Sequence, residues 1–122
     1  METTLIAVVN LPQHYCQGAF GIVLLEVGSF GAIKIFKNDI LNTERPIKVF
    51  NAEVAAYEII MINSHLQQHT PKFYGRVKVS KILDHTGVDV SNEYMLDFCY
   101  QIHKSGTNPG HPNLAIKPQT IV

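Results

Sequence analysis

The sequence has 122 residues, of which 46% are hydrophobic and 16% are charged. This length corresponds to a single domain, and the composition favours a chain that builds a core over a disordered one. Lys and Arg together number 10, and so do Asp and Glu. With no excess of positive charge, the chain has no electrostatic basis for binding nucleic acid or an anionic membrane.

The two cysteines and the N-terminal residues bear on the cellular location. Cys16 and Cys99 are too few for a disulfide scaffold, so we expect free thiols in a reducing compartment. No basic region precedes the short apolar run at residues 5–9, which argues against a signal peptide. No stretch approaches the roughly 18 apolar residues of a membrane span. We therefore expect a cytoplasmic protein without a membrane partner.

The first half of the chain contains three expected strands. Residues 5–9 form a short β-branched apolar run, and residues 22–27 form another. A turn signal rich in glycine follows at residues 28–31. Residues 32–37 then alternate, with Ile33 and Ile35 on one face of the strand. The last two strands are predicted to form a hairpin that follows a glycine-containing loop.

The second half of the chain predicts one helix and two strands. The helix is expected over residues 46–66, because Phe50, Val54, Tyr57 and Met61 recur at helical spacing, with Glu53 beside this apolar face. Strands are expected over residues 73–83 and 93–100.

These elements predict an α+β fold, in which a five-stranded antiparallel sheet carries one main helix on one face. The predicted domain covers residues 1–103. Glycines and prolines recur through residues 104–122, which we expect to be an irregular C-terminal tail.

Three polar or glycine features follow one another along the predicted sheet and helix. Gly18 and Gly21 lie between two strands, where glycines allow a backbone to approach a ligand closely. Lys34 lies on the third strand, and Glu53 follows it 19 residues later, on the inner side of the helix. Each feature alone is common: glycines mark turns, and single charged side chains are usually solvated.

In combination and in this order, the three features resemble those of protein kinases. Kinases carry a loop G-x-G-x-x-G-x-V, a lysine in an A-x-K motif on the third strand, and a glutamate on the next helix that pairs with this lysine. Cys16 occupies the position of the first glycine, which departs from the motif. The matching residues are Gly18, Gly21, Val23, Ala32, Lys34 and Glu53.

The resemblance extends over roughly residues 5–100, the length of a kinase small N-terminal lobe. Residues 70–75 resemble the segment that follows the kinase helix, and residues 94–98 resemble the fifth strand entering the hinge. By this matching, Leu96 would be the gatekeeper, and Asp97 and Phe98 would offer backbone groups to an adenine ring. ATP is thus the cofactor that the resemblance implies as a candidate.

No H-R-D, D-F-G or A-P-E motif is present, and residues 101–122 contain no aspartate or glutamate. Phosphoryl transfer needs a carboxylate that orients the nucleophile and ligands for Mg²⁺. The first hypothesis is therefore a non-catalytic interaction or regulatory protein, which binds a protein partner or a second copy through the face that a large lobe normally covers. The alternative is the ATP-binding half of a split kinase that is completed in trans. A third reading is a kinase fragment with no selected role.

A metal site is the remaining candidate. His65 and His69 are four residues apart and could share a helix face toward a metal ion. No carboxylate or cysteine is close in sequence to complete such a site, and imidazoles near a helix C-terminus are favoured by the helix dipole. We therefore expect no metal site.

Overall fold

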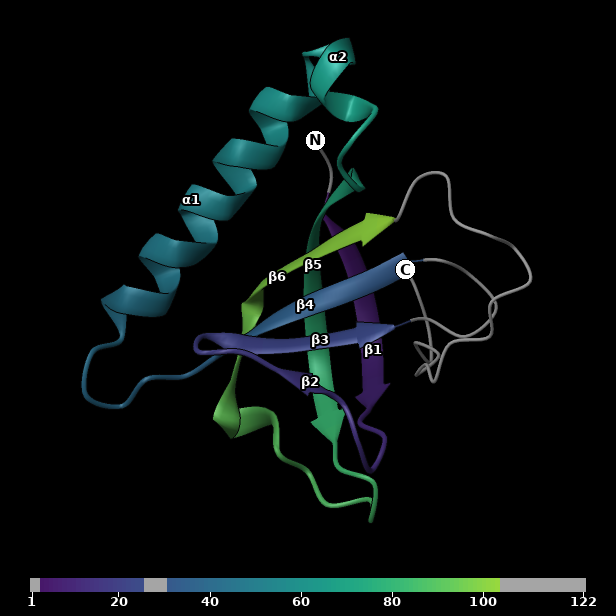
Figure 1. Cartoon of the computed structure of the whole chain (residues 1–122). Helices are drawn as coiled ribbons and strands as arrows, with labels where there is room; N and C mark the ends of the chain where they lie inside the picture. Colours follow the sequence, from purple (N-terminus) through teal and green to yellow (C-terminus); the bar gives the residue numbers. More distant parts are fainter. Residues whose placement is uncertain (1–2, 26–30, 104–122) are drawn as a thin grey trace.

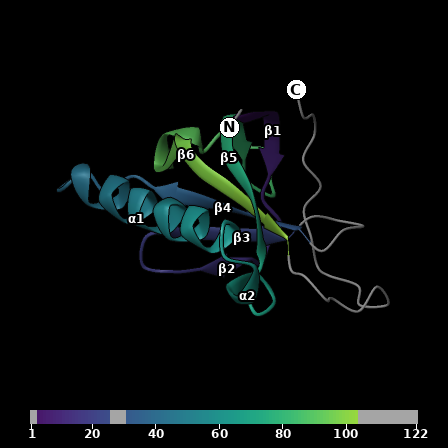
Figure 2. The same ribbon diagram turned by 90° about the horizontal axis from the view of Figure 1, so that it is seen from above.

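The structure is a computed structural model that describes residues 3–25 and 31–103. It consists of one sheet with a long helix on one side (Figures 1 and 2). The elements in chain order are β1 (Thr4–Asn10), β2 (Cys16–Gln17), β3 (Gly21–Leu25), β4 (Gly31–Lys37), α1 (Glu44–Met61), α2 (Ser64–Gln67), β5 (Lys72–Leu83), the 3-10 turn η1 (Ser91–Glu93) and β6 (Tyr94–His103).

In the described part of the chain, the sheet has six strands in the order β1-β5-β6-β4-β3-β2. The α+β class is confirmed, but the expectation of five antiparallel strands is wrong in two respects. β1 pairs in parallel with β5 at the opposite edge, and the two-residue β2 takes the position beside β3. The apolar run at residues 5–9 identifies a strand correctly. Its composition carries no information about which strand it pairs with, because the pairing is decided by tertiary packing.

Strand β5 changes its inward face at Gly75. Phe73 pairs with Ile102 and Gly75 with Gln101, so one extra residue lies between these two pairs. Gly75 has φ of 117°, which side-chain-bearing residues rarely adopt. This bulge places both Phe73 and Arg76 on the side of α1, and Arg76 lies over the ring of Phe50.

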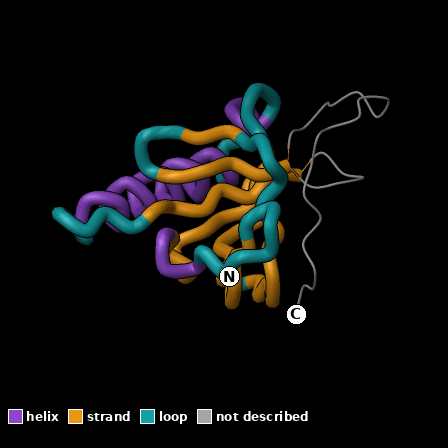
Figure 3. The backbone as a smooth tube through the Cα atoms, turned by 90° about the horizontal axis from the view of Figure 1, so that it is seen from below, coloured by secondary structure: helices purple, strands orange, loops and turns teal. Residues whose placement is uncertain are grey.

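The sheet has a separate apolar core on each face. Strand β5 pairs with β6 through its first half and with β1 through its second half, so the sheet curls (Figure 3). The face away from α1 encloses the larger core, which we call the sheet core. It consists of Ile6, Val9, Leu11, Ile22, Leu24, Ile33, Ile35, Val77, Val79, Ile82, Tyr94 and Cys99. On the other face, α1 covers the helix core, which consists of Phe36, Phe50, Val54, Phe73 and Tyr100.

The predicted helix over residues 46–66 is two helices in the structure. Helix α1 ends at Met61, and the side chain of Asn63 then accepts hydrogen bonds from the amides of His65 and Leu66 to begin α2. The apolar periodicity ends at Met61, and the prediction extended the helix to Leu66 because it missed the capping role of Asn63. In the part of the chain that the structure describes, no helix is long and apolar enough to cross a membrane.

Three of the predicted segments lie partly or wholly outside the described residues, and one of them is the turn at residues 28–31. The predicted strand at 22–27 is observed from Gly21 to Leu25, and its last two residues lie outside. The tail predicted at residues 104–122 lies outside as well. Strand β6 continues to His103, three residues beyond the predicted end at Tyr100.

Candidate functional site

The side chains of Lys34 and Glu53 form an ion pair between the sheet and the helix. Lys34 comes from the middle of β4 and Glu53 from the inner side of α1. The Nζ atom of Lys34 lies 2.9 Å from Oε1 and 3.1 Å from Oε2 of Glu53. The two side chains are 24% and 30% exposed, so the pair lies at the margin of the helix core and remains accessible to solvent. The pairing that the sequence predicted is present.

Tyr100 on β6 is a third member of this cluster. Its hydroxyl group donates a hydrogen bond to Oε1 of Glu53 over 2.5 Å. Burial raises the pKa of Tyr100 far above its ordinary value, and the hydrogen bond to the Glu53 carboxylate adds to the rise. Burial, and then the charge of Glu53, also raises the pKa of Tyr57. Both phenols therefore stay protonated, and that of Tyr100 is the donor to the carboxylate.

Strand register places several predicted site residues on one face. Val23 is the cross-strand neighbour of Lys34 on one side, and Tyr100 is its neighbour on the other. Ala32 lies two residues before Lys34 and therefore on the same face, opposite Ile102. The structure thus brings together Val23, Ala32, Lys34 and Glu53.

The loop between β2 and β3 is tight, and its glycines have different surroundings. The amide of Gly18 donates to the carbonyl of Gly21 over 2.8 Å, which closes the loop. A Cβ atom on Gly21 would collide with the carbonyl oxygen of Ile35 and lie 3.0 Å from the Cα atom of Phe36. A Cβ atom on Gly18 would meet nothing closer than 3.8 Å. Packing against β4 is therefore sufficient to explain a glycine at position 21.

The predicted hinge residues do not lie at the end of a strand. β6 runs through Leu96, Asp97 and Phe98 without leaving the sheet. Leu96 packs against the sheet core, on the opposite side from Lys34. The structure therefore places no strand end at residues 96–98, and the gatekeeper role of Leu96 and the hinge role of Asp97 and Phe98 stay predictions. Tyr100 and Ile102 occupy the corresponding places opposite Lys34 and Ala32.

The side chains of the three predicted hinge residues have other contacts. Asp97 is exposed and lies 3.7 Å from the Nζ atom of Lys78. Phe98 packs edge-on against Phe50 beneath α1, with ring centroids 5.3 Å apart. The sequence placed the end of the strand too early, because the apolar run of residues 94–98 resembles a complete strand. The pairing of β6 with β4 and β5 continues beyond this run to His103.

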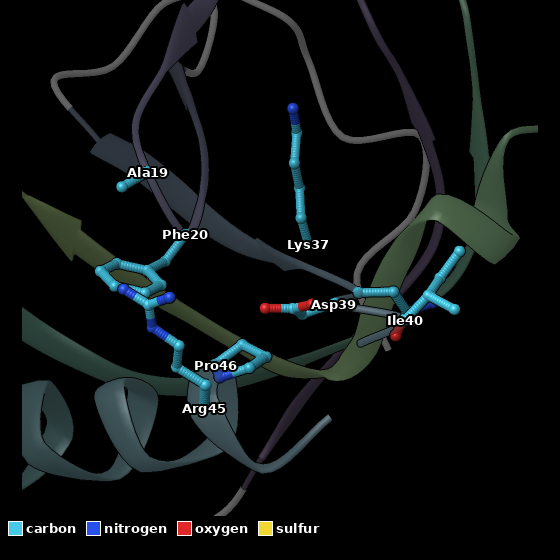
Figure 4. A pocket seen from close by; sticks show the side chains of 8 residues that line it. Ala19, Phe20, Lys37, Asp39, Ile40, Arg45 and Pro46 are labelled. Carbon is cyan, nitrogen blue, oxygen red and sulfur yellow. The ribbon is translucent and has the colours of Figure 1, made fainter. Parts of the chain in front are cut away.

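A hollow of about 520 Å³ lies between the tip of the β2–β3 loop and the start of α1. Figure 4 shows the guanidinium group of Arg45 against the ring of Phe20, while the side chain of Lys37 points away from it. The Nζ atom of Lys37 instead donates to Gln17 over 3.0 Å. Asp39 contributes a carboxylate that also accepts from the amides of its own turn. The hollow therefore carries charges of both signs and no concentration of either.

The described cysteine and histidine residues considered as reactive or metal-binding groups do not form a catalytic or metal site. Cys16 is exposed, whereas Cys99 is buried, and burial raises the pKa of the Cys99 thiol so that it stays neutral. The rings of His65 and His69 lie 6.0 Å apart. Within residues 3–25 and 31–103, no three histidine, cysteine, aspartate or glutamate side chains are placed to share a metal ion.

Sequence reasoning missed Tyr100 as a site residue. One available signal was that Tyr100 follows Phe98 by two positions on an expected strand, which places both side chains on one face. A buried tyrosine hydroxyl group needs a hydrogen-bonding partner. Glu53 was already predicted to face the same space.

Comparisons of the chain with protein-family models, with curated proteins and with solved structures found no match. The chemistry open to the cluster follows from its geometry. The Lys34 ammonium group has three N–H donors, and two of them serve Glu53. The third can donate to an anion without breaking the ion pair.

Proposed function

We propose that this chain is a non-catalytic interaction protein that resembles a kinase small lobe and binds a protein partner on the side of α1. The observation that carries the proposal is the open margin of the helix core. Its apolar side chains are only partly buried, and apolar surface that remains open to solvent can serve as an interaction site.

The two cores differ in how completely they are enclosed. Among residues 3–25 and 31–103, the sheet core has twelve buried residues, and three partly buried apolar residues pack against it. Within the same ranges the helix core has five buried residues, and seven partly buried residues border it. We call these seven the rim: Phe20, Val49, Tyr57, Met61, Met95, Phe98 and Ile102. A partner that covers the rim would complete the helix core and remove apolar area from water.

Two features of the cluster favour a structural role over a nucleotide-binding one. Glu53 already accepts hydrogen bonds from both Lys34 and Tyr100, so its carboxylate is satisfied within the chain. Gly21 is required by its contact with Ile35, whether or not a phosphate is ever bound. The residues that resemble the kinase motif thus have local reasons to be present.

The alternative is the ATP-binding half of a split kinase, and the ion pair favours it. Lys34 would hold phosphate oxygens through its remaining N–H group while Glu53 orients it. Val23 and Ala32 would then lie against the base, because they share the face of Lys34. This reading requires a second chain that supplies the Mg²⁺ ligands.

Calorimetry with ATP, with and without Mg²⁺, separates the two readings. The interaction reading expects no saturable binding at millimolar ATP, for the wild type as for Lys34→Ala. Saturable binding that Lys34→Ala weakens at least about tenfold would favour the split kinase instead, since a lost contact to a charged group has roughly this effect. The thermal midpoint measured with the same ligand gives an independent reading.

Polar substitutions on the rim test the partner surface directly. Met61→Glu alters the rim at the end of α1, and Phe20→Ser alters it near the β2–β3 loop. Val88→Glu, on the exposed β5–β6 connection, is the matched control. We expect a partner that binds the wild type and Val88→Glu to be lost with both rim variants. Sedimentation of the purified chain shows whether this partner is a second copy. Equal binding by all four proteins, each verified as folded by circular dichroism, would remove the rim from the proposal.

A further inference from the structure

The edge of the sheet at β3 is only partly covered. Strand β2 has two residues, and its pairing with β3 consists of Gln17 with Ile22 and Cys16 with Val23. Gln13 and His14 bend the chain away before this pairing can continue. Among the residues that the structure describes, Leu24 and Leu25 therefore have no strand beside them at this edge.

The direction of the Leu25 backbone groups follows from two hydrogen bonds in the loop. Gly18 donates to Gly21 on the side of β2, and Lys37 donates to Phe20 on the side of β4. Backbone groups in an antiparallel strand alternate between its two neighbours. Positions 21, 23 and 25 hence point toward the edge, so the amide and carbonyl groups of Leu25 are directed at the uncovered position.

An apolar hollow of about 300 Å³ lies at the same edge. This volume is enough for one or two aliphatic side chains, at the small end of known ligand pockets. An uncovered strand edge beside such a hollow has the two features that recognise an extended peptide, which are main-chain hydrogen bonds and a side-chain pocket. The hollow is lined by Pro12, His14, Tyr15, Cys16, Val23, Leu24 and Leu25.

The described chain stops close to this edge. His103 at the end of β6 pairs with Gly31, and the neighbouring Ala32 pairs with Leu25, so both lie at the same end of the sheet. A strand added beside Leu25 would be three strand spacings from β6, about 14 Å. Residues 104–122 follow His103, and residues 104–113 alone could span up to roughly 33 Å.

We propose that residues 114–116 of the C-terminal tail add an extended segment to the edge of β3. Leu114 and Ile116 are apolar and two positions apart, so both face the same side of an extended segment. In this arrangement they enter the hollow while the backbone pairs with Leu25. Because the segment is covalently attached through His103, its local concentration at the edge is high. A small contact area is therefore enough for it to bind there. The proposal does not depend on the rim, because the rim and the hollow have no residue in common.

A disulfide trap tests the placement, because Cys16 lines the hollow and is exposed. The full-length chain would carry Ile116→Cys, with Thr107→Cys as a matched control near the start of the tail. Under mild oxidation we expect Ile116→Cys to form an intramolecular bond with Cys16 about fivefold faster than Thr107→Cys does. The same variants on a Cys16→Ser background should form none, because Cys99 is buried.

Thiol labelling of Cys16 gives a second reading that needs no cross-link. The double substitution Leu114→Asp and Ile116→Asp should raise the labelling rate of Cys16 roughly fivefold over the wild type, by uncovering the hollow. Equal labelling rates would overturn the proposal, as would equal trapping of Ile116→Cys and Thr107→Cys. Cross-links found only between two chains, at a rate that rises with concentration, would also overturn it, because the edge would then take a segment from another molecule.

Discussion

The carboxylate of Glu53 receives hydrogen bonds from two side chains of the sheet, and this sharing gives Tyr100 a measurable role. Tyr100→Phe removes one donor to a charged acceptor and should lower the free energy of unfolding at pH 7 by about 1–2 kcal/mol. Tyr74→Phe is the matched control, because Tyr74 is exposed on the outer side of β5. Urea unfolding of the two variants measures the difference. An equal effect of both would show that the hydroxyl group of Tyr100 is not held by Glu53.

The raised pKa of Tyr100 adds a dependence on pH to the same variant. Because the pKa in the folded chain lies above the ordinary value of 10.0, folding favours the protonated phenol. This contribution is complete below pH 10 and is lost as the pH rises further, when the unfolded chain ionises and the folded chain does not. The free energy of unfolding should therefore fall less steeply above pH 10 in Tyr100→Phe than in the wild type. A parallel fall in the two proteins would contradict the assignment.

Gly21 and Gly18 give a matched pair for the β2–β3 loop. Gly21→Ala forces a Cβ atom against the backbone of β4, which cannot move without disturbing the strand, so we expect a loss of at least about 2 kcal/mol in unfolding free energy. Gly18→Ala has room and a backbone without positive φ, so we expect a change within about 0.5 kcal/mol. Thermal unfolding of the two variants measures this difference in stability. Similar midpoints would show that the backbone of β4 shifts to accommodate the added methyl group.

At the scale of elements, the start of α1 depends on Asn42, although the helix is preceded directly by Thr43. The side chain of Thr43 makes no capping hydrogen bond, whereas Oδ1 of Asn42 accepts from the amide of Arg45 over 3.2 Å. Asn42→Ala should therefore destabilise the chain by about 1 kcal/mol, and Thr43→Ala should have little effect. Urea unfolding compares them, and the reverse order would place the cap at Thr43.

The elements also show where prediction from sequence succeeds. Alternation identifies β4 and β5, helical spacing identifies α1, and short apolar runs identify β1, β3 and β6. The pair of Lys34 and Glu53, by contrast, was expected from the resemblance to kinases, and the structure contains this ion pair. Periodicity describes one segment at a time. It therefore cannot predict how two segments pair with each other.

The features that prediction missed are relations between segments. The parallel pairing of β1 with β5 leaves no mark in the composition of Thr4–Asn10. The bulge at Gly75 and the extension of β6 to His103 both depend on the register of neighbouring strands. The side of the sheet on which Leu96 lies could not be predicted for the same reason, because an apolar residue in a strand that is buried on both faces gives no sign of its side.

On the scale of the whole molecule, the two faces of the sheet should differ in stability. The sheet core is enclosed by strands that are joined by hydrogen bonds, whereas α1 is held through a core with an open margin. Local opening that releases α1 exposes less buried area than opening of the sheet, so it should require less free energy. The cluster of Lys34, Glu53 and Tyr100 is one of the contacts across which this opening would occur.

Amide hydrogen exchange measures this difference directly. We expect amides of β4 and of the β5–β6 pairing to exchange at least about tenfold more slowly than those in the last two turns of α1, and α2 to exchange faster still. A partner that covers the rim should slow exchange in α1 while leaving β4 unchanged, because it adds contacts only on the open side. Tyr100→Phe should accelerate exchange in α1 more than in β4, for the same reason. Uniform protection across α1 and β4 would mean that the molecule opens as one unit, and the open margin would then have no energetic consequence for the helix.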